Sequence, residues 1–197
     1  MRLWMIVTEP ALRVLERDGE LVADGRRTSR DFRPAYRWMA EQMTARIGPP
    51  PRPGALPLWA WAQWLGPKQR QPDMRYSGHQ PRGTACFRLA LDMPDAQVLL
   101  SDFDDWHAVL NGWHLSQSEA DADAFDADLA AADVPWGWPY PEPFRSRVVG
   151  SWTRVFDLDR SGRDPVWHGD PAQQSIQATL WRLAAGQVGR IERFTAR

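Results

Sequence analysis

Cysteine is nearly absent from the sequence, because Cys86 is the single one among 197 residues. One cysteine cannot form an intrachain disulfide, and it cannot supply the several thiolates of a zinc finger or zinc ribbon. Long apolar runs are absent as well, and the first run, residues 2–7, is too short for a signal-peptide core or a membrane span. We therefore expect a soluble, cytoplasmic protein without a structural zinc site of these types.

The chain also lacks an excess of either charge. It has 24 Lys and Arg residues against 25 Asp and Glu residues, for a net charge of -1. A general phosphate-binding surface usually comes with a basic excess, so the composition gives no strong nucleic-acid signal. The GxGxxG, Walker, GxSxG and HExxH patterns are missing too, so no short motif names a reaction. A small molecule or a nucleotide remains open as a ligand, and the sequence identifies no protein partner.

Tryptophan and proline are abundant, with 12 and 17 residues. The length and the hydrophobic fraction of 43% are typical of one globular domain with a single core, which we place at residues 1–197. Most of the tryptophans belong in such a core. The indole N–H and the large ring also favour tryptophan where a ligand or a partner is bound.

Apolar patterning and capping residues indicate a mixture of strands and helices. The segments 133–143 and 157–171 are predicted to be irregular. Strands are predicted over residues 2–7, 58–64, 84–93, 97–100, 175–183 and 187–194, and helices over 9–18, 34–47, 102–113, 118–132 and 144–156. This order predicts an α+β fold, in which several helices flank one mixed or antiparallel sheet, either continuous or split.

The densest group of chemically active side chains is SDFDDWH at residues 101–107. Ser101 or Asp102 stands where a helix N-cap belongs, and Asp104 and Asp105 fall in the first turn, where acidic residues are favoured. The same carboxylates and His107 could instead converge as an acid–base site or as an oxygen-rich metal site. The capping interpretation accounts for the aspartates better than for His107. Both interpretations stay open at this point.

Six motifs are spread over nearly the whole chain: RLW (2–4), FRPAYRWMAEQM (32–43), LWAWAQW (58–64), PDMRYSGH (72–79), QVLLSDFDDWHAVLNGW (97–113) and SIQATLW (175–181). Together they resemble a bacterial family known as domain of unknown function 3841. The resemblance implies a single soluble domain. It implies no mechanism, because no activity is established for the family.

The opening RLWMIVTEPALRVLERDGEL is similar to the start of small ADP-ribosyltransferase-like proteins. This resemblance implies a split sheet that holds NAD, with Arg or His on the first strand, polar or aromatic residues on a middle strand and Glu on a late strand. In this chain Arg2, then Trp59 and Trp61, and then Gln177 occupy those strands. Gln177 departs from the pattern, because a neutral amide stabilises positive charge at the ribose less well than a carboxylate does.

The first functional hypothesis is therefore an ADP-ribosyltransferase-like enzyme that binds NAD or another nucleotide. Trp59 and Trp61 would stack on a base, and Arg2 or Arg75 would contact a phosphate. This hypothesis assigns no metal ligand. The predicted catalytic residues are Asp102, Asp105, His107 and Gln177.

Two other hypotheses belong to different functional classes. One is a non-catalytic interaction module, in which the Trp- and Pro-rich segment 135–144 docks a protein partner. The other is a metal-dependent hydrolase centred on Asp102, Asp104, Asp105 and His107. The sequence does not decide among the three.

Overall fold

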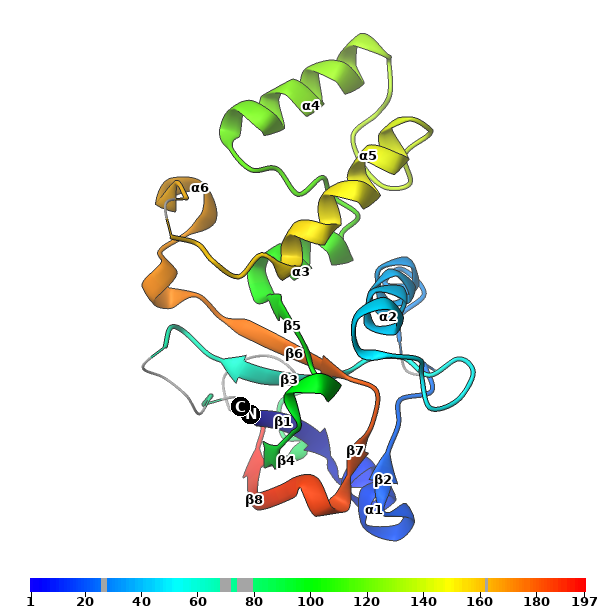
Figure 1. Cartoon of the computed structure of the whole chain (residues 1–197), viewed down its shortest axis with the longest axis vertical. Helices are drawn as coiled ribbons and strands as arrows, with labels where there is room; N and C mark the ends of the chain where they lie inside the picture. Colours follow the sequence, from blue (N-terminus) through cyan, green and yellow to red (C-terminus); the bar gives the residue numbers. More distant parts are fainter. Residues whose placement is uncertain (26–27, 68–71, 74–79, 162) are drawn as a thin grey trace.

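An antiparallel six-stranded sheet runs through the middle of the molecule (Figure 1). The computed structural model describes residues 1–25, 28–67, 72–73, 80–161 and 163–197. The strands are β1 (Arg2–Thr8), β2 (Glu20–Leu21), β3 (Leu58–Gln63), β4 (Ala85–Asp92), β5 (Leu99–Asp102), β6 (Ile176–Leu180), β7 (Leu183–Ala184) and β8 (Val188–Thr195). The order in the large sheet is β5-β6-β3-β1-β4-β8, and β2 pairs with β7 in a second sheet. The predicted α+β fold is confirmed, with the antiparallel alternative correct.

Helices flank the sheet and extend beyond one end of it. They are α1 (Glu9–Asp18), α2 (Arg33–Ile47), α3 (Phe103–Leu110), α4 (Glu119–Ala131), α5 (Phe144–Ser151) and α6 (Pro165–His168), with 3-10 helices η2 (Asp95–Gln97), η3 (Trp152–Phe156), η4 (Pro171–Gln173) and η5 (Ala185–Gln187). Within the residues that the structure describes, none of the helices is long and apolar enough to cross a membrane.

Local signals explain the first helix. Helix α1 begins after Thr8, has Pro10 in its first turn and ends at Gly19. The φ angle of Gly19 is 74°, a left-handed conformation that glycine adopts without the steric cost of a Cβ atom. Capping residues therefore predict both ends of α1 from the sequence.

Three predictions differ from the structure. The strand expected over 175–183 divides into β6 and β7, which belong to different sheets. The helix expected over 144–156 divides into α5 and η3, and the segment 157–171, expected to be irregular, contains α6. Helix α6 forms because Asp164 accepts a hydrogen bond from the backbone N–H of Val166 and because Pro165 suits a first helical position. The single turn is too short to give a periodic apolar pattern.

The two faces of the sheet are covered by different elements. On one face, Leu12 and Leu15 of α1 pack in a cluster with strand residues that include Leu3, Met5, Ala60, Leu89, Leu91, Ala178 and Leu180. The opposite face, on which Trp59 lies, is continuous with a larger cluster from α2, α3, α4, α5 and η3 that includes Trp38, Met39, Met43, Trp106, Val109, Phe125, Val148, Trp152 and Val155. The apolar core therefore has two main parts. One lies between the sheet and α1, and the larger one lies among α2, α3, α4, α5 and η3 on the other side.

The large sheet is nearly divided between β1 and β3. Strand β1 pairs with β4 along its whole length, from Arg2 opposite Asp92 to Thr8 opposite Cys86. With β3, in contrast, β1 pairs only where Trp4 lies opposite Trp61. The sheet therefore consists of two three-stranded halves, β5-β6-β3 and β1-β4-β8, that are joined at one point.

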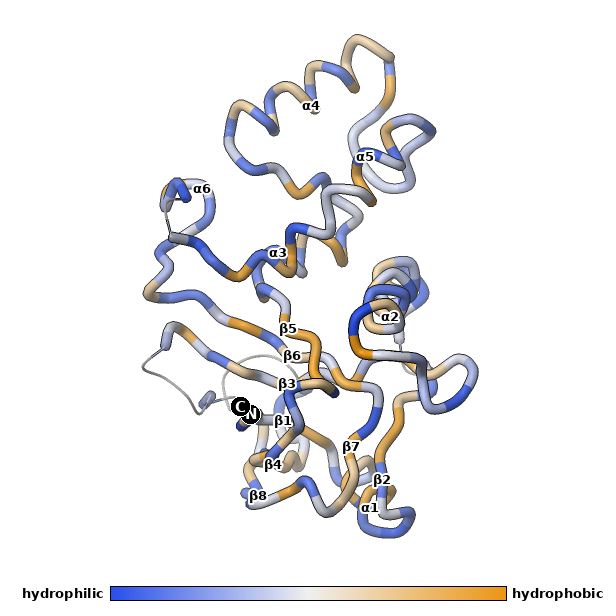
Figure 2. The backbone as a smooth tube through the Cα atoms, in the orientation of Figure 1, coloured by the Kyte–Doolittle hydropathy of each residue, from blue (hydrophilic) through white to orange (hydrophobic). Residues whose placement is uncertain are grey.

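Helix α4 lies at the end of the molecule opposite to α1 (Figure 1). Hydrophilic and less polar segments alternate along it (Figure 2), and Phe125 and Leu129 are its buried residues. Its exposed acidic residues are Glu119, Asp123, Asp126 and Asp128. Helix α4 therefore presents negative charge to the solvent.

Candidate functional site

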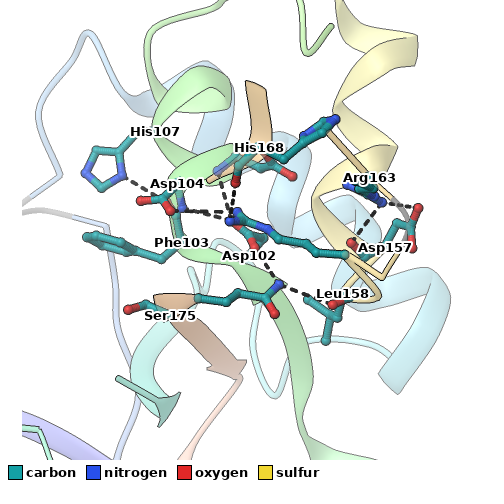
Figure 3. A network of polar contacts seen from close by, with 12 residues as sticks. Asp102, Phe103, Asp104, His107, Asp157, Leu158, Arg163, His168 and Ser175 are labelled. Atoms are coloured by element: carbon teal, nitrogen blue, oxygen red, sulfur yellow. Dashed lines mark hydrogen bonds and ion pairs between the residues drawn. The ribbon is translucent and has the colours of Figure 1, made fainter. Parts of the chain in front are cut away.

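A buried polar network surrounds the start of α3 (Figure 3). Asp102 is fully buried, and its Oδ1 accepts hydrogen bonds from the backbone N–H groups of Asp104 at 3.0 Å and Asp105 at 3.2 Å. The Nη2 of Arg160 donates to the same oxygen at 2.6 Å, and the Nε2 of Gln174 donates to Oδ2 at 2.8 Å. The capping interpretation of Asp102 is confirmed, and a buried ion pair is added to it.

These contacts use both carboxylate oxygens of Asp102. No pattern in the sequence points to Arg160 and Gln174, which lie 58 and 72 positions further along the chain than Asp102. Across the described segments, no group of three or more His, Cys, Asp or Glu side chains could hold a metal ion. The ion pair therefore gives Asp102 a structural role at the base of α3.

Asp105 differs from Asp102 because its side chain faces a cavity. Burial, with the nearby charge of Asp102, raises the pKa of Asp105 to about 6, although Arg160 and Arg163 act in the opposite direction. The cavity has a volume of about 360 Å³. Its lining residues are Asp105, Leu115, Ser116, Gln117, Arg154, Asp157, Arg163, Asp164 and His168. Asp105 is thus a predicted catalytic residue that combines a raised pKa with a position beside open space.

His107 does not line this cavity. Its Nδ1 donates to the carbonyl oxygen of Phe103 at 2.9 Å, and its ring meets the Phe103 ring edge-on with centroids 4.4 Å apart. Figure 3 shows His107 on the opposite side of the view from Arg163. The structure therefore does not bring His107 and Asp105 into one site.

Gln177 lies in a row of side chains that crosses the sheet. Ser101 of β5 is opposite Gln177 of β6, Gln177 is opposite Trp61 of β3, and Trp61 is opposite Trp4 of β1. Directly opposite residues point to the same face of a sheet. The Oε1 of Gln177 and the Oγ of Ser101 are buried and have no hydrogen-bond partner among the described residues. Two polar groups are thus held in a row next to tryptophan rings.

Aromatic rings surround this row. Trp61 lies with its ring centroid 4.5 Å from that of Trp64 and 4.8 Å from that of Phe103. Trp4 and Trp61 form a small buried cluster against which Trp64 and Phe103 pack. Phe103 is also the first residue of α3, so this aromatic cluster lies next to the buried network at Asp102.

An open hollow of about 980 Å³ lies along the junction of the two halves of the sheet. Its lining includes Met1, Arg2, Trp4, Ala62, Gln63, Pro67, Arg88, Ala90, Leu91, Asp92, Gly189, Arg190 and Glu192. Arg88 and Arg190 both form ion pairs with Glu192, and the distance between Arg190 Nη2 and Glu192 Oε1 is 2.7 Å. Arg2 is an exposed residue. The predicted phosphate contact Arg2 therefore lies on the wall of a hollow large enough for a nucleotide.

The other predicted ligand contacts lie elsewhere. Trp59 packs among helices, with ring centroids 5.9 Å from Tyr36 and 4.6 Å from Trp106. Trp59 and Trp61 share a face of β3 by alternation, but only Trp61 lies beside Trp4. Arg75 lies outside the described residues. The structure thus separates the predicted residues into the hollow, the Trp61–Gln177 row, the Asp105 cavity and the helical core.

The Trp- and Pro-rich segment is irregular up to residue 143, as predicted, and Phe144 begins α5. Trp136 is 61% exposed, and its ring centroid lies 5.7 Å from that of Trp113, which is 43% exposed. Trp138 is partly buried against Trp152, and Tyr140 is buried. The exposed aromatic surface is therefore the Trp113–Trp136 pair rather than the whole segment.

Comparisons with known proteins place the chain in a family. No curated protein and no solved structure is significantly similar to it. The family model described as Domain of unknown function (DUF3841) matches residues 2–189, which is nearly the whole chain. The chain therefore belongs to the DUF3841 family.

Proposed function

We propose that the protein binds NAD or a related nucleotide in the hollow at the junction of the two halves of the sheet. The observation that carries the proposal is the near-division of the sheet, because β1 and β3 pair only at Trp4 and Trp61 and the hollow opens beside that pair. Its volume of about 980 Å³ is near the upper end of small-molecule sites.

The charges in the hollow suit a phosphate-bearing ligand. Its lining contains the guanidinium groups of Arg2, Arg88 and Arg190 and the carboxylates of Asp92 and Glu192. Glu192 is already paired with two of the arginines, whereas Arg2 is exposed at the rim. Arginine binds phosphate oxygens through paired N–H groups, so Arg2 is the proposed phosphate contact.

The resemblance of the opening segment to small ADP-ribosyltransferase-like proteins motivates the choice of NAD as the ligand. That similarity calls for ligand contacts from a first, a middle and a late strand, and here β3 lies between β1 and β6 in the sheet. Trp4, Trp61 and Gln177 are consecutive in the row that crosses these strands. Trp4 is the member of this row that lines the hollow, whereas Trp61 and Gln177 are not part of its lining. Gln177 also cannot supply the negative charge of a carboxylate.

A thermal melt with and without NAD tests the proposal. A ligand at about 100 times its dissociation constant adds roughly 2.7 kcal/mol to the free energy of unfolding, which raises the Tm of a domain of this size by about 5–10 °C. We expect this rise with millimolar NAD and a much smaller rise for Arg2→Ala, because the phosphate loses its guanidinium contact.

The matched control for that melt is Arg37→Ala, which removes an exposed arginine of α2 that is not part of the hollow. Its response to NAD is expected to equal that of the wild type. ADP serves as the second ligand and tests whether the adenine and phosphates suffice. Melts that do not move with either NAD or ADP would contradict the proposal.

A second candidate function, protein docking, is favoured by the exposed pair Trp113 and Trp136. Large exposed aromatic side chains are typical anchors of protein interfaces. We expect the double variant Trp113→Ala, Trp136→Ala to lose a partner that the wild type retains in a pull-down and to keep its Tm within about 3 °C. Val166→Ala is the control, since Val166 is 94% exposed and lies in α6. Recovery of the same partner by the double variant would exclude this surface.

A further inference from the structure

We propose that the cavity beside α3 is a binding site for a small organic cation that carries an amine or guanidinium group, with Asp105 as its anionic contact. This site is separate from the hollow proposed for a nucleotide, and none of its lining residues is shared with the hollow. The proposal rests on the walls of the cavity, on the balance of its charges and on its size.

The walls of the cavity are held together by hydrogen bonds across the chain. The indole Nε1 of Trp167 donates to the carbonyl oxygen of Ser116 at 3.1 Å, and the Nε2 of His168 contacts the carbonyl oxygen of Gln117 at 2.8 Å. The Nη1 of Arg160 donates to the carbonyl oxygen of His168 at 2.5 Å. Hydrogen bonds therefore connect α6 to residues 116–117 and to Arg160 of the buried network at Asp102. They hold the walls of the cavity in place.

The arginines of the cavity already have acceptors within the protein. Arg154 donates to the carbonyl oxygen of Leu115 and to Asp121 at 3.3 Å. Arg163 donates to the carboxylate of Asp157. Each guanidinium thus already has a carboxylate as its ionic partner within the protein.

The carboxylates of the cavity give it a surplus of negative charge. Asp105, Asp157 and Asp164 outnumber the two arginines of the lining. Asp157 is paired with Arg163, and Asp164 accepts a hydrogen bond from the backbone N–H of Val166. No side-chain hydrogen bond is found for Asp105 within the described ranges, so its carboxylate is the group left to receive a ligand.

The contact between His168 and Gln117 has a defined direction. A carbonyl oxygen only accepts hydrogen bonds, so the Nε2 of His168 donates to Gln117. The carboxylate oxygens of Asp105 remain as acceptors in the lining, and they match the N–H groups of an amine or a guanidinium.

The size and composition of the cavity select an organic cation rather than a metal ion. Its volume of about 360 Å³ lies at the lower end of small-molecule sites and far exceeds that of a bare ion. No His, Cys, Asp or Glu cluster of metal-binding geometry occurs in the described part of the chain. Burial disfavours the ionised form of the Asp105 carboxylate and so raises its pKa. A bound cation would favour the ionised form again, and this attraction would stabilise the bound ligand.

Agmatine, which has a guanidinium at one end and an amine at the other, is the probe for this site. In ¹H–¹⁵N NMR titrations at pH 8, we expect it to shift the amide signals of Asp105, of residues 115–117 and of residues 163–168. Butane-1,4-diol, which lacks the charges, should leave them unchanged. Asp105→Asn keeps the shape of the side chain and removes its charge, and it should weaken agmatine binding at least about tenfold.

Asp104→Asn is the matched control, because Asp104 is the adjacent carboxylate, is 66% exposed and does not line the cavity. Agmatine should bind this variant as it binds the wild type. Equal binding to the Asp105→Asn variant, or no shift at all in the wild type, would overturn the proposal. A response of the same amides to inorganic phosphate and not to agmatine would overturn it too, in favour of an anion site.

Discussion

Replacing Asp102 with alanine is expected to lower the free energy of unfolding by about 4 kcal/mol or more. The substitution removes the N-cap of α3, and it leaves the guanidinium of Arg160, which is 4% exposed, with only the exposed carboxylate of Asp104 at 3.7 Å. A buried charge without a partner is costly, whereas the loss of the cap alone costs about 1 kcal/mol. For a chain of this length the Tm should fall by roughly 10 °C or more. Denaturant unfolding and thermal melts both measure this loss.

Two further variants distinguish the buried charge from the cap. Asp104→Ala, in the same helical turn but 66% exposed, should change the Tm only slightly. Adding Arg160→Met to the Asp102→Ala variant removes the stranded guanidinium, and this double variant should recover part of the lost stability. If Asp102→Ala melted like the wild type, the ion pair and the cap would not have the structural role assigned to them.

Replacing Asp105 with asparagine is expected to stabilise the protein at pH 8 and not at pH 4.5. The pKa of Asp105 is about 6 in the folded state against an ordinary value of 3.8, so the folded state binds more protons between these two values. The free energy of unfolding therefore falls as the pH rises from about 4 to about 6, and the ionised carboxylate destabilises the fold above that window. A shift of about two pH units corresponds to roughly 3 kcal/mol.

We expect Asp105→Asn to raise the Tm by roughly 5 °C at pH 8, since asparagine has no charge to bury. Melts of the wild type and the variant in a series of buffers from pH 4.5 to pH 8 measure the difference. Asp104→Asn should show no comparable gain, because that side chain is exposed. A variant that was less stable than the wild type at pH 8 would show that the charge of Asp105 is favourable in the fold.

The parts of the fold that depend on neighbours in sequence could be predicted. The cap at Asp102 and the ends of α1 at Thr8 and Gly19 involve residues within a few positions of one another. Strand β3 was also predictable, because a run of tryptophan and alanine fits a strand that is buried on both faces. Local capping and periodicity are encoded in short windows of sequence, so these features need no knowledge of the tertiary fold.

The assembly of the site could not be predicted in the same way. Alternation correctly places Trp59 and Trp61 on one face of β3, but it does not say that α2 and α3 cover Trp59 while Trp61 packs beside Trp4. Arg160 reaches Asp102 from a segment without a periodic pattern, and only the fold brings the two together. Long-range pairing also decides which carboxylate becomes a structural partner and which one, Asp105, faces a cavity.

The near-division of the sheet has a consequence for how the chain acquires its structure. The half β1-β4-β8 and the half β5-β6-β3 are interleaved along the sequence, so neither half can form from one continuous segment. Strand β4 has β1 on one side but remains an open edge on the other until β8 has been synthesised about 95 residues later. Pairings between such distant segments slow folding and expose edges that associate with other chains. During synthesis, β4 with its apolar residues Phe87, Leu89 and Leu91 is thus exposed to pairing with other chains, and so is β3 until β6 has been made.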